Sequence, residues 1–293
     1  MESKLFTPVT FGPLTLRNRT IRSAAFESMC PGNAPSDMLL DYHRSVAAGG
    51  IGMTTVAYAA VTQSGLSFDR QLWMRPEIIP GLRRLTDAIH AEGAAAGIQL
   101  GHCGNMSHKS ICGCMPVGAS SGFNLYSPTF VRGLRADELP EMARAYGRSV
   151  NLAREAGFDS VEIHAGHGYL ISQFLSPSTN HRKDEFGGSL QNRMRFMDMV
   201  MEEVMKAAGN DMAVFVKMNM RDGFKGGMEI DESIQVAKRL LELGAHGLVL
   251  SGGFVSKAPM YVMRGAMPIR SMSYYMNCWW LKYGVRMLSL IHI

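Results

Sequence analysis

Four stretches of the chain repeat one pattern, in which a helix end is followed by a glycine-containing turn and an apolar strand. They are SVAAGGIGMTTVAY from Ser45, IHAEGAAAGIQL from Ile89, LAREAGFDSVEI from Leu152 and LLELGAHGLVL from Leu240. Each glycine suits the left-handed position just past a helix. The strands are nearly continuous apolar runs, which is typical of parallel strands buried on both faces. With Thr20–Ala24 and Ala213–Met218 added, we expect six strands.

Amphipathic helices are predicted between these strands. In 139–156 the apolar positions recur at spacings of three and four, at Leu139, Met142, Tyr146, Val150 and Ala153. In 231–243 we expect Asp231 as the N-cap and a buried stripe of Ile234, Ala237, Leu240 and Leu241. Strands that alternate with helices predict a parallel sheet with right-handed crossovers.

The choice of α/β architecture depends on the turn after the first strand. This turn, Ser23–Glu27, contains no glycine, which disfavours a doubly wound dinucleotide-binding sheet. We therefore predict a (β/α)8 TIM barrel, of which six strands are evident. The long segments Gln63–Pro80 and Gly101–Pro140 follow the second and third strands, and we expect them to form functional loops over the C-terminal face.

The end of the chain does not continue the pattern. After Ser251-Gly252-Gly253, the residues from about 254 contain no clear strand–helix pair. We expect residues 1–293 to form a single barrel domain that is incomplete at its C-terminus, with strands 7 and 8 missing.

Composition excludes several classes of function. The 30 Lys and Arg residues exceed the 25 Asp and Glu residues by five, and the excess is too small and scattered for a nucleic-acid-binding surface. The N-terminus lacks an apolar signal region, and no apolar run approaches the ~20 residues that span a bilayer. We expect no membrane association and a cytoplasmic location.

Five cysteines, an odd number at irregular spacing, argue against a disulfide framework and for a reducing compartment. Cys103, Cys112 and Cys114 lie close in sequence, but their spacing matches no metal motif, so we favour free thiols over metal ligands.

The candidate chemistry lies in 160–196. An apolar strand with Val161 and Ile163 is followed by His164, His167 and Tyr169. A loop comes next, and Ser189 is expected to cap a helix from Leu190. Strand ends are where parallel α/β proteins place their catalytic groups.

Three interpretations of the histidine pair remain open. His164 and His167 can bind a metal, although no third ligand is evident, so we expect none. They can be structural histidines with satisfied hydrogen bonds. They can also hold a substrate carbonyl by hydrogen bonds, with Tyr169 as a proton donor. A tyrosine taken alone at this position is more often a packed aromatic residue with a paired hydroxyl.

Several segments resemble the Old Yellow Enzyme family of NAD(P)H:flavin oxidoreductases and ene-reductases. These segments are LFTPVTFGPLTLRNR from Leu5, RPEIIPGLRRL from Arg75, IQLGHCG from Ile98, EIHAGHGYLISQFLSPSTNHRKDEFGGSLQNRMRF from Glu162 and LSGG from Leu250. The likeness extends from Leu5 to about Met287. The family includes the barrel domains of dienoyl-CoA reductases and bile-acid enone reductases.

The resemblance implies an activity and its residues. FMN would lie on the C-terminal face of the barrel, NADH or NADPH would reduce it, and its N5 would deliver hydride to an alkene conjugated to a carbonyl. His164 and His167 match the pair that binds the substrate carbonyl, and Tyr169 matches the proton donor. The substrate would be a small enone, enoate or dienoyl thioester, and a homo-oligomer is left open.

The resemblance also implies cofactor contacts. Gln99 matches an amide that pairs with the flavin pyrimidine edge, the alternative being an ordinary capping amide. Lys217 matches a basic residue beside flavin N1, where Arg is common, the alternative being a solvated surface lysine. Ala25 and Phe26 stand where many members have the Thr or Cys that tunes the flavin.

A competing expectation comes from the missing strands. In the family, strands 7 and 8 cradle the FMN phosphate, and the sequence shows no counterpart. The alternative function is therefore a non-catalytic fragment that cannot retain flavin.

Overall fold

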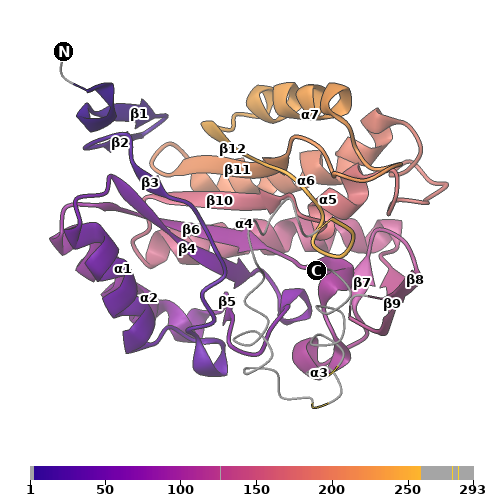
Figure 1. Cartoon of the computed structure of the whole chain (residues 1–293), viewed down its shortest axis with the longest axis horizontal. Coiled ribbons are helices and arrows are strands. Elements are labelled where there is room, and N and C mark those ends of the chain that lie inside the picture. Colours follow the sequence, from indigo (N-terminus) through magenta and orange to yellow (C-terminus); the bar gives the residue numbers. More distant parts are fainter. Residues whose placement is uncertain (1–2, 126, 259–278, 280–282, 284–293) are drawn as a thin grey trace.

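The protein is built around one curled parallel sheet (Figure 1). The computed structural model describes residues 3–125, 127–258, 279 and 283. The strand order is β3 (Ile21–Arg22), β4 (Met53–Ala60), β6 (Ala95–Gly101), β10 (Ser160–Ala165), β11 (Ala213–Asn219) and β12 (Gly247–Ser251), and β5 (Leu72–Trp73) pairs with β4. All of these pairs are parallel.

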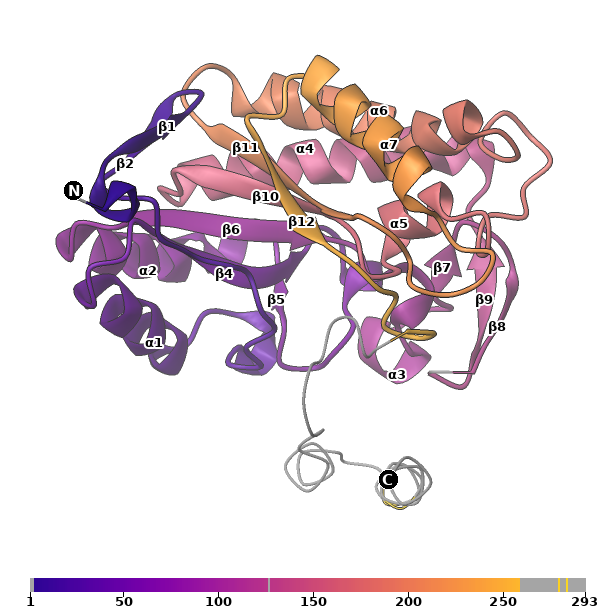
Figure 2. The ribbon, with the colours of Figure 1, turned by 45° about the horizontal axis from the view of Figure 1, so that its top comes forward.

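Helices connect consecutive strands of this sheet. The long ones are α1 (Asp37–Ala48), α2 (Ile79–Ala91), α4 (Leu139–Glu155), α6 (Leu190–Ala208) and α7 (Ile230–Glu242). The short ones are α3 (Lys109–Cys112) and α5 (Leu170–Leu175). In Figure 2 the long helices lie along the outside of the sheet, with α4 and α6 side by side. This is the predicted (β/α)8-barrel architecture, and the six predicted strands are confirmed within the described residues.

Two smaller sheets lie at the two ends of the main sheet. The antiparallel pair β1 (Val9–Phe11) and β2 (Leu14–Leu16) lies at the N-terminal ends of the strands, where Phe11 packs on Phe215 at 5.1 Å between ring centroids. The long segment after β6 forms a three-stranded sheet of β7 (Val117–Gly118), β9 (Thr129–Gly133) and β8 (Gly122–Asn124). It lies beside the C-terminal ends of the main strands (Figure 1), as expected for an insertion that covers the site.

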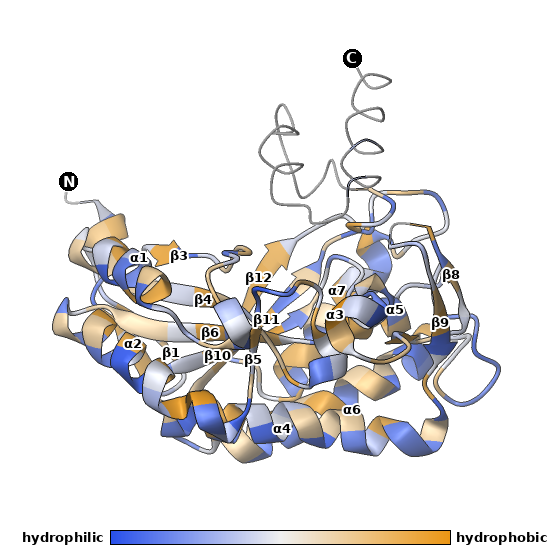
Figure 3. Ribbon diagram, turned by 90° about the horizontal axis from the view of Figure 1, so that it is seen from below, coloured by the Kyte–Doolittle hydropathy of each residue, from blue (hydrophilic) through white to orange (hydrophobic). Residues whose placement is uncertain are grey.

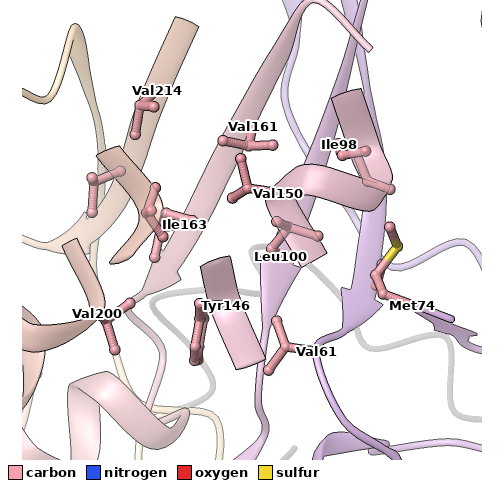
Figure 4. Packing of buried hydrophobic residues seen from close by; sticks show 14 of the residues in the cluster. Val61, Met74, Ile98, Leu100, Tyr146, Val150, Val161, Ile163, Val200 and Val214 are labelled. Atoms are coloured by element: carbon pink, nitrogen blue, oxygen red, sulfur yellow. The ribbon is translucent and has the colours of Figure 1, made fainter. Parts of the chain in front are cut away.

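The hydrophobic core lies between the sheet and the long helices, with the largest helix pair, α4 and α6, at its centre. Figure 4 shows Tyr146 and Val150 of α4 facing Val161 and Ile163 of β10. All four side chains are buried, because the helix stripe and the strand bring apolar residues to the same layer. Along α4 and α6, hydrophilic and hydrophobic residues alternate (Figure 3). The predicted stripe of α4 is therefore confirmed.

Helix ends also follow the sequence. The glycines at the four repeated turns, Gly50, Gly93, Gly157 and Gly244, all have positive φ angles between 73° and 96°. Ser189 caps α6, because its Oγ accepts a hydrogen bond from the backbone N–H of Asn192. No helix in the described part of the chain is both long and apolar enough to cross a membrane.

The prediction for α7 was wrong in two respects. The helix begins at Ile230 with Glu229 as the N-cap, so Asp231 lies in the first turn. Leu240 is buried and Ala237 is partly buried as predicted, but Ile234 and Leu241 are about half exposed, and Ser233 and Val236 are buried in their place. The reason is that α7 lies at the β12 end of the sheet, where only one of its sides contacts α6 and β11.

Two other predictions concern the first strand and the end of the chain. The first strand is shorter than expected, spanning only Ile21–Arg22. Most of the tail predicted from about residue 254 lies outside the described residues.

A buried arginine joins three helices. Arg193 of α6 is 3% exposed, donates to the carbonyl oxygens of Leu175 and Gly188, and pairs with Glu232 of α7. We expect Arg193→Met to lower the free energy of unfolding by about 3 kcal/mol, because it leaves Glu232 and the two carbonyls without their donor. Urea denaturation measures the change.

The matched control is Arg195→Met, which removes an exposed arginine two residues away and should change the unfolding free energy by less than about 0.5 kcal/mol. Equal effects of the two substitutions would contradict a structural role for the buried group.

Candidate active site

The parallel register of β6, β10 and β11 brings the predicted polar residues together. Glu162 of β10 is paired with Gln99 of β6, and His164 is paired with Lys217 of β11. Because side chains alternate along a strand, Glu162 and His164 point to the same face of the sheet. All four side chains are buried, with exposed fractions of 4–5%.

An ion pair lies at the centre of this group. Glu162 Oε1 is 3.0 Å from Lys217 Nζ and accepts a hydrogen bond of 2.6 Å from Gln99 Nε2. Sequence reasoning missed Glu162. The available signal was its charge within a strand that is otherwise buried and apolar, since a buried carboxylate needs a partner.

Lys217 also connects the sheet to the loop after β3. Its Nζ donates to Ser23 Oγ at 3.2 Å and to the Ala24 carbonyl at 3.1 Å. The alternative of a solvated lysine is therefore wrong. Ala25 follows directly and is exposed.

A second ion pair fixes the far end of the same loop. Glu27 Oε1 lies 2.6 Å from Arg22 and 3.0 Å from His43 Nε2 of α1. The backbone between Ser23 and Glu27 is thus held at both ends.

The histidine pair and the tyrosine form one aromatic cluster. The ring centroids of His164 and His167 are 5.0 Å apart with planes at 87°, and Tyr169 lies 4.6 Å from His164. Tyr58 of β4 completes the cluster at 5.4 Å from Tyr169. His164 therefore contacts both His167 and Tyr169, and the three predicted catalytic residues lie together just after the C-terminal end of β10.

A strained turn positions this cluster. His167 has φ of +58°, which is uncommon for a residue other than glycine. Its backbone N–H donates to Asn219 Oδ1 at 2.9 Å. A Cβ at Gly168 would lie 2.3 Å from the Phe254 ring, so only glycine fits there. Strain held by surrounding contacts is typical of functional sites.

Both histidines are neutral at pH 7. Burial, with smaller contributions from His167 and Lys217, lowers the pKa of His164 well below its ordinary value of 6.5. Burial and Lys217 lower the pKa of His167 to about 4. The Gly166 N–H donates to His164 Nδ1 at 3.3 Å, so the proton of this imidazole is on Nε2. His167 Nε2 lies 2.6 Å from Ser251 Oγ, a residue that sequence reasoning did not single out.

Metal chemistry finds no support in this region. Among the described residues, no group of three or more His, Cys, Asp or Glu side chains could hold a metal ion. Cys103, Cys112 and Cys114 are free, and burial raises the pKa of Cys103 to about 12. Cys278 lies outside the described residues.

The side chains of Gln99 and Lys217 have the hydrogen-bonding groups that suit one edge of a flavin. A flavin pyrimidine ring alternates hydrogen-bond acceptors with a donor. The Gln99 amide has both functions, and Lys217 contributes a buried cation. The exposed backbone at Ala25 is available beside them. These residues could hold FMN by its pyrimidine edge.

The Glu162–Lys217 pair can be tested by a double-mutant cycle. We expect Glu162→Gln to lower the free energy of unfolding by about 3 kcal/mol, because it leaves the buried Lys217 charge without its counterion. The double variant Glu162→Gln/Lys217→Met removes both charges and should lose less than the sum of the single variants. Urea denaturation at pH 7 measures all four proteins, and additive losses would contradict a direct interaction.

The neutral histidines predict a pH-dependent stability. The unfolded chain protonates these imidazoles below pH 6.5, whereas the folded protein does not, so the unfolded state binds more protons. The contribution of these imidazoles to the free energy of unfolding should therefore level off above about pH 7 and be lost progressively as the pH drops from 6.5 towards 4. His102, whose pKa burial lowers to about 3, contributes in the same direction.

Urea denaturation at pH 7, 6, 5 and 4 measures this slope. The variant His164→Asn/His167→Asn should reduce it without abolishing it, and asparagine tolerates the backbone angle at position 167. An unchanged slope in this variant would show that the two imidazoles are not buried in the neutral form.

Comparison with known proteins places the chain in a family. The chain matches the NADH:flavin oxidoreductase / NADH oxidase family over residues 4–282. It is 41% identical over 267 residues to 4,4'-dithiodibutanoate disulfide reductase of Rhodococcus erythropolis, covering 90% of this chain and 66% of that protein. It is 34% identical to NADPH dehydrogenase of Bacillus subtilis, covering 90% of this chain and 78% of that one.

Solved structures agree with the sequence comparison. An Old Yellow Enzyme homologue from Zymomonas mobilis superimposes with a TM-score of 0.79 at 28% identity, covering 86% of this chain and 74% of that one. The chain spans 66% of the disulfide reductase and 38% of a metal reductase of Desulforamulus reducens, to which it is 34% identical. The chain belongs to the NADH:flavin oxidoreductase / NADH oxidase family, the Old Yellow Enzyme family, whose cofactors are FMN and NAD(P)H.

Proposed function

We propose that this chain is an FMN-dependent ene-reductase that uses NADH or NADPH to reduce the C=C bond of an α,β-unsaturated carbonyl compound. The observation that supports it best is the cluster of His164, His167 and Tyr169. Two neutral imidazoles and a phenol pack together at the end of a barrel strand, beside a buried cation and an amide.

The histidines bind the substrate oxygen. His164 has its proton on Nε2, because its Nδ1 accepts from the Gly166 backbone. If Ser251 donates to His167 Nε2, the second proton is on Nδ1. Neutral N–H donors held in a buried site stabilise the enolate oxygen as negative charge develops on it.

Tyr169 donates the proton that completes the reduction. Its ring is fixed between Tyr58 and His164, so the hydroxyl has a defined position relative to the bound carbonyl. Proton transfer from a positioned side chain typically contributes 10²–10⁴-fold to a rate.

Gln99, Lys217 and Ala25 hold the cofactor in this proposal. Bound FMN supplies the hydride acceptor and donor that no side chain offers. Glu162 fixes the position of both Gln99 and Lys217 by its two contacts. Replacing Lys217 by another cationic residue would therefore disturb the Glu162 carboxylate as well as the contact with the flavin edge.

Disulfide reduction is a second candidate. The relative that is 41% identical is named for reduction of the disulfide 4,4'-dithiodibutanoate. In that reaction one NAD(P)H and one proton convert the disulfide to two thiols. The same imidazole N–H groups would then stabilise a thiolate that leaves from the disulfide.

NAD(P)H oxidation with 2-cyclohexenone and with 4,4'-dithiodibutanoate separates the two reactions. We expect turnover of the enone by the FMN-loaded chain, and a loss of about 10²–10³-fold in kcat/KM for His164→Ala, because one oxyanion donor is removed. Tyr169→Phe should lower kcat less if water can replace the proton donor. The control His90→Gln alters a surface histidine that pairs with Asp159 and should have wild-type activity.

Reduction of the disulfide without reduction of the enone would favour the second candidate. Undiminished enone reduction by both His164→Ala and Tyr169→Phe would overturn the assigned roles.

A further inference from the structure

A polar pocket lies beside the proposed reaction site. Its volume is about 260 Å³, and it lies between the β8–β9 hairpin, the loop after α5 and the turn after β12. Its polar wall is made by Ser120, Ser178, Thr179, His181 and Lys257. Its apolar wall includes Phe123, which packs edge to face on Phe130 at 5.1 Å.

The pocket's cation is Lys257, whose side chain is exposed at the rim. Lys257 Nζ donates to Ser178 Oγ at 2.6 Å and lies 4.9 Å from the Phe224 ring centroid. In the described part of the chain, no carboxylate pairs with Lys257 and none lines the pocket. His181 is on the same wall, where its backbone N–H donates to Ser120 Oγ at 2.9 Å.

The pocket shares its supports with the histidine turn. Val255 N–H donates to the His167 carbonyl at 3.0 Å, and Lys257 N–H donates to the Phe254 carbonyl at 3.0 Å. On the other side, Gln173 Nε2 donates to Asn105, which lines the pocket, and to the Gly168 carbonyl. The same two segments, the turn after β12 and the start of α5, therefore hold both the pocket wall and the turn that carries His167.

We propose that this pocket binds the anionic group, a phosphate or a carboxylate, of the small molecule that reacts at the histidine pair. Lys257 supplies the charge and the serine and threonine hydroxyls supply hydrogen bonds, which together suit such oxygens. Phe123 and Leu125 on the opposite wall contact the apolar or planar part of the ligand.

The proposal rests on the proposed function only in taking the ligand to be a molecule that reacts at the histidine pair. A phosphate would come from the nicotinamide nucleotide, and a carboxylate would come from the unsaturated substrate.

Calorimetric titration of the whole purified chain tests this pocket. The probes are NADPH, 4-oxo-2-pentenoate and the methyl ester of that acid, each titrated into wild type, Lys257→Met and Lys257→Arg. We expect Lys257→Met to raise the Kd about tenfold for the probe whose anion occupies the pocket, which corresponds to about 1.4 kcal/mol. Lys257→Arg should retain most of the affinity. An effect on NADPH alone assigns the site to the reductant, and an effect on the acid but not on its ester assigns it to the substrate.

Salt and a distant lysine provide the controls. Added salt should weaken binding of that probe to wild type more than to Lys257→Met, because it screens the charge. Lys206→Met removes an exposed lysine at the other end of the barrel and should leave every Kd unchanged.

Several results would overturn the proposal: no binding of either anionic probe by wild type, equal Kd values for wild type and Lys257→Met, or an equal loss in Lys206→Met. Because binding is measured without turnover, a chain that binds an anion at Lys257 but reduces no enone would refute only the proposed function.

Discussion

The buried ion pair between Glu162 and Lys217 is the interaction on which the site depends. Two charges inside a sheet are costly unless each has partners, and here Gln99, Ser23 and the Ala24 carbonyl supply them. The pair and its partners come from three strands, β6, β10 and β11, and from the loop after β3. The pair therefore fixes the relative positions of segments that are far apart in sequence, and it does so inside the sheet, just before the strands end.

The same strand ends explain why the histidines are neutral and oriented. His164 is on the same face as Glu162, so it is buried next to a lysine that already has its carboxylate. Burial deprives a protonated imidazole of solvation, and the nearby His167 and Lys217 oppose its charge to a smaller extent, so the pKa of His164 is lowered. The turn through His167 and Gly168 then brings Tyr169 back onto His164, so that one short segment carries all three groups.

Much of this arrangement could be predicted from sequence, because it depends on local patterns. Continuous apolar runs predicted the strands, the glycine turns predicted the helix ends, and the order of His164 and Tyr169 after a strand predicted the cluster. Glu162 was missed because its partners are on other strands, and only the register reveals them. The buried face of α7 was mispredicted for the same reason. Periodicity shows how wide the apolar face of a helix is, but not which part of that face a neighbouring element covers. Lys257 lies in a stretch without periodicity, so its pocket could not be predicted.

The most direct test of this account is the visible absorption spectrum of the purified chain after FMN is added and the free flavin removed. The account predicts a retained flavin band that NADPH bleaches under anaerobic conditions and that 2-cyclohexenone restores. A protein that retains no flavin would contradict it. So would a retained band that NADPH bleaches but the enone does not restore, because the site would then hold the cofactor without performing the proposed reaction.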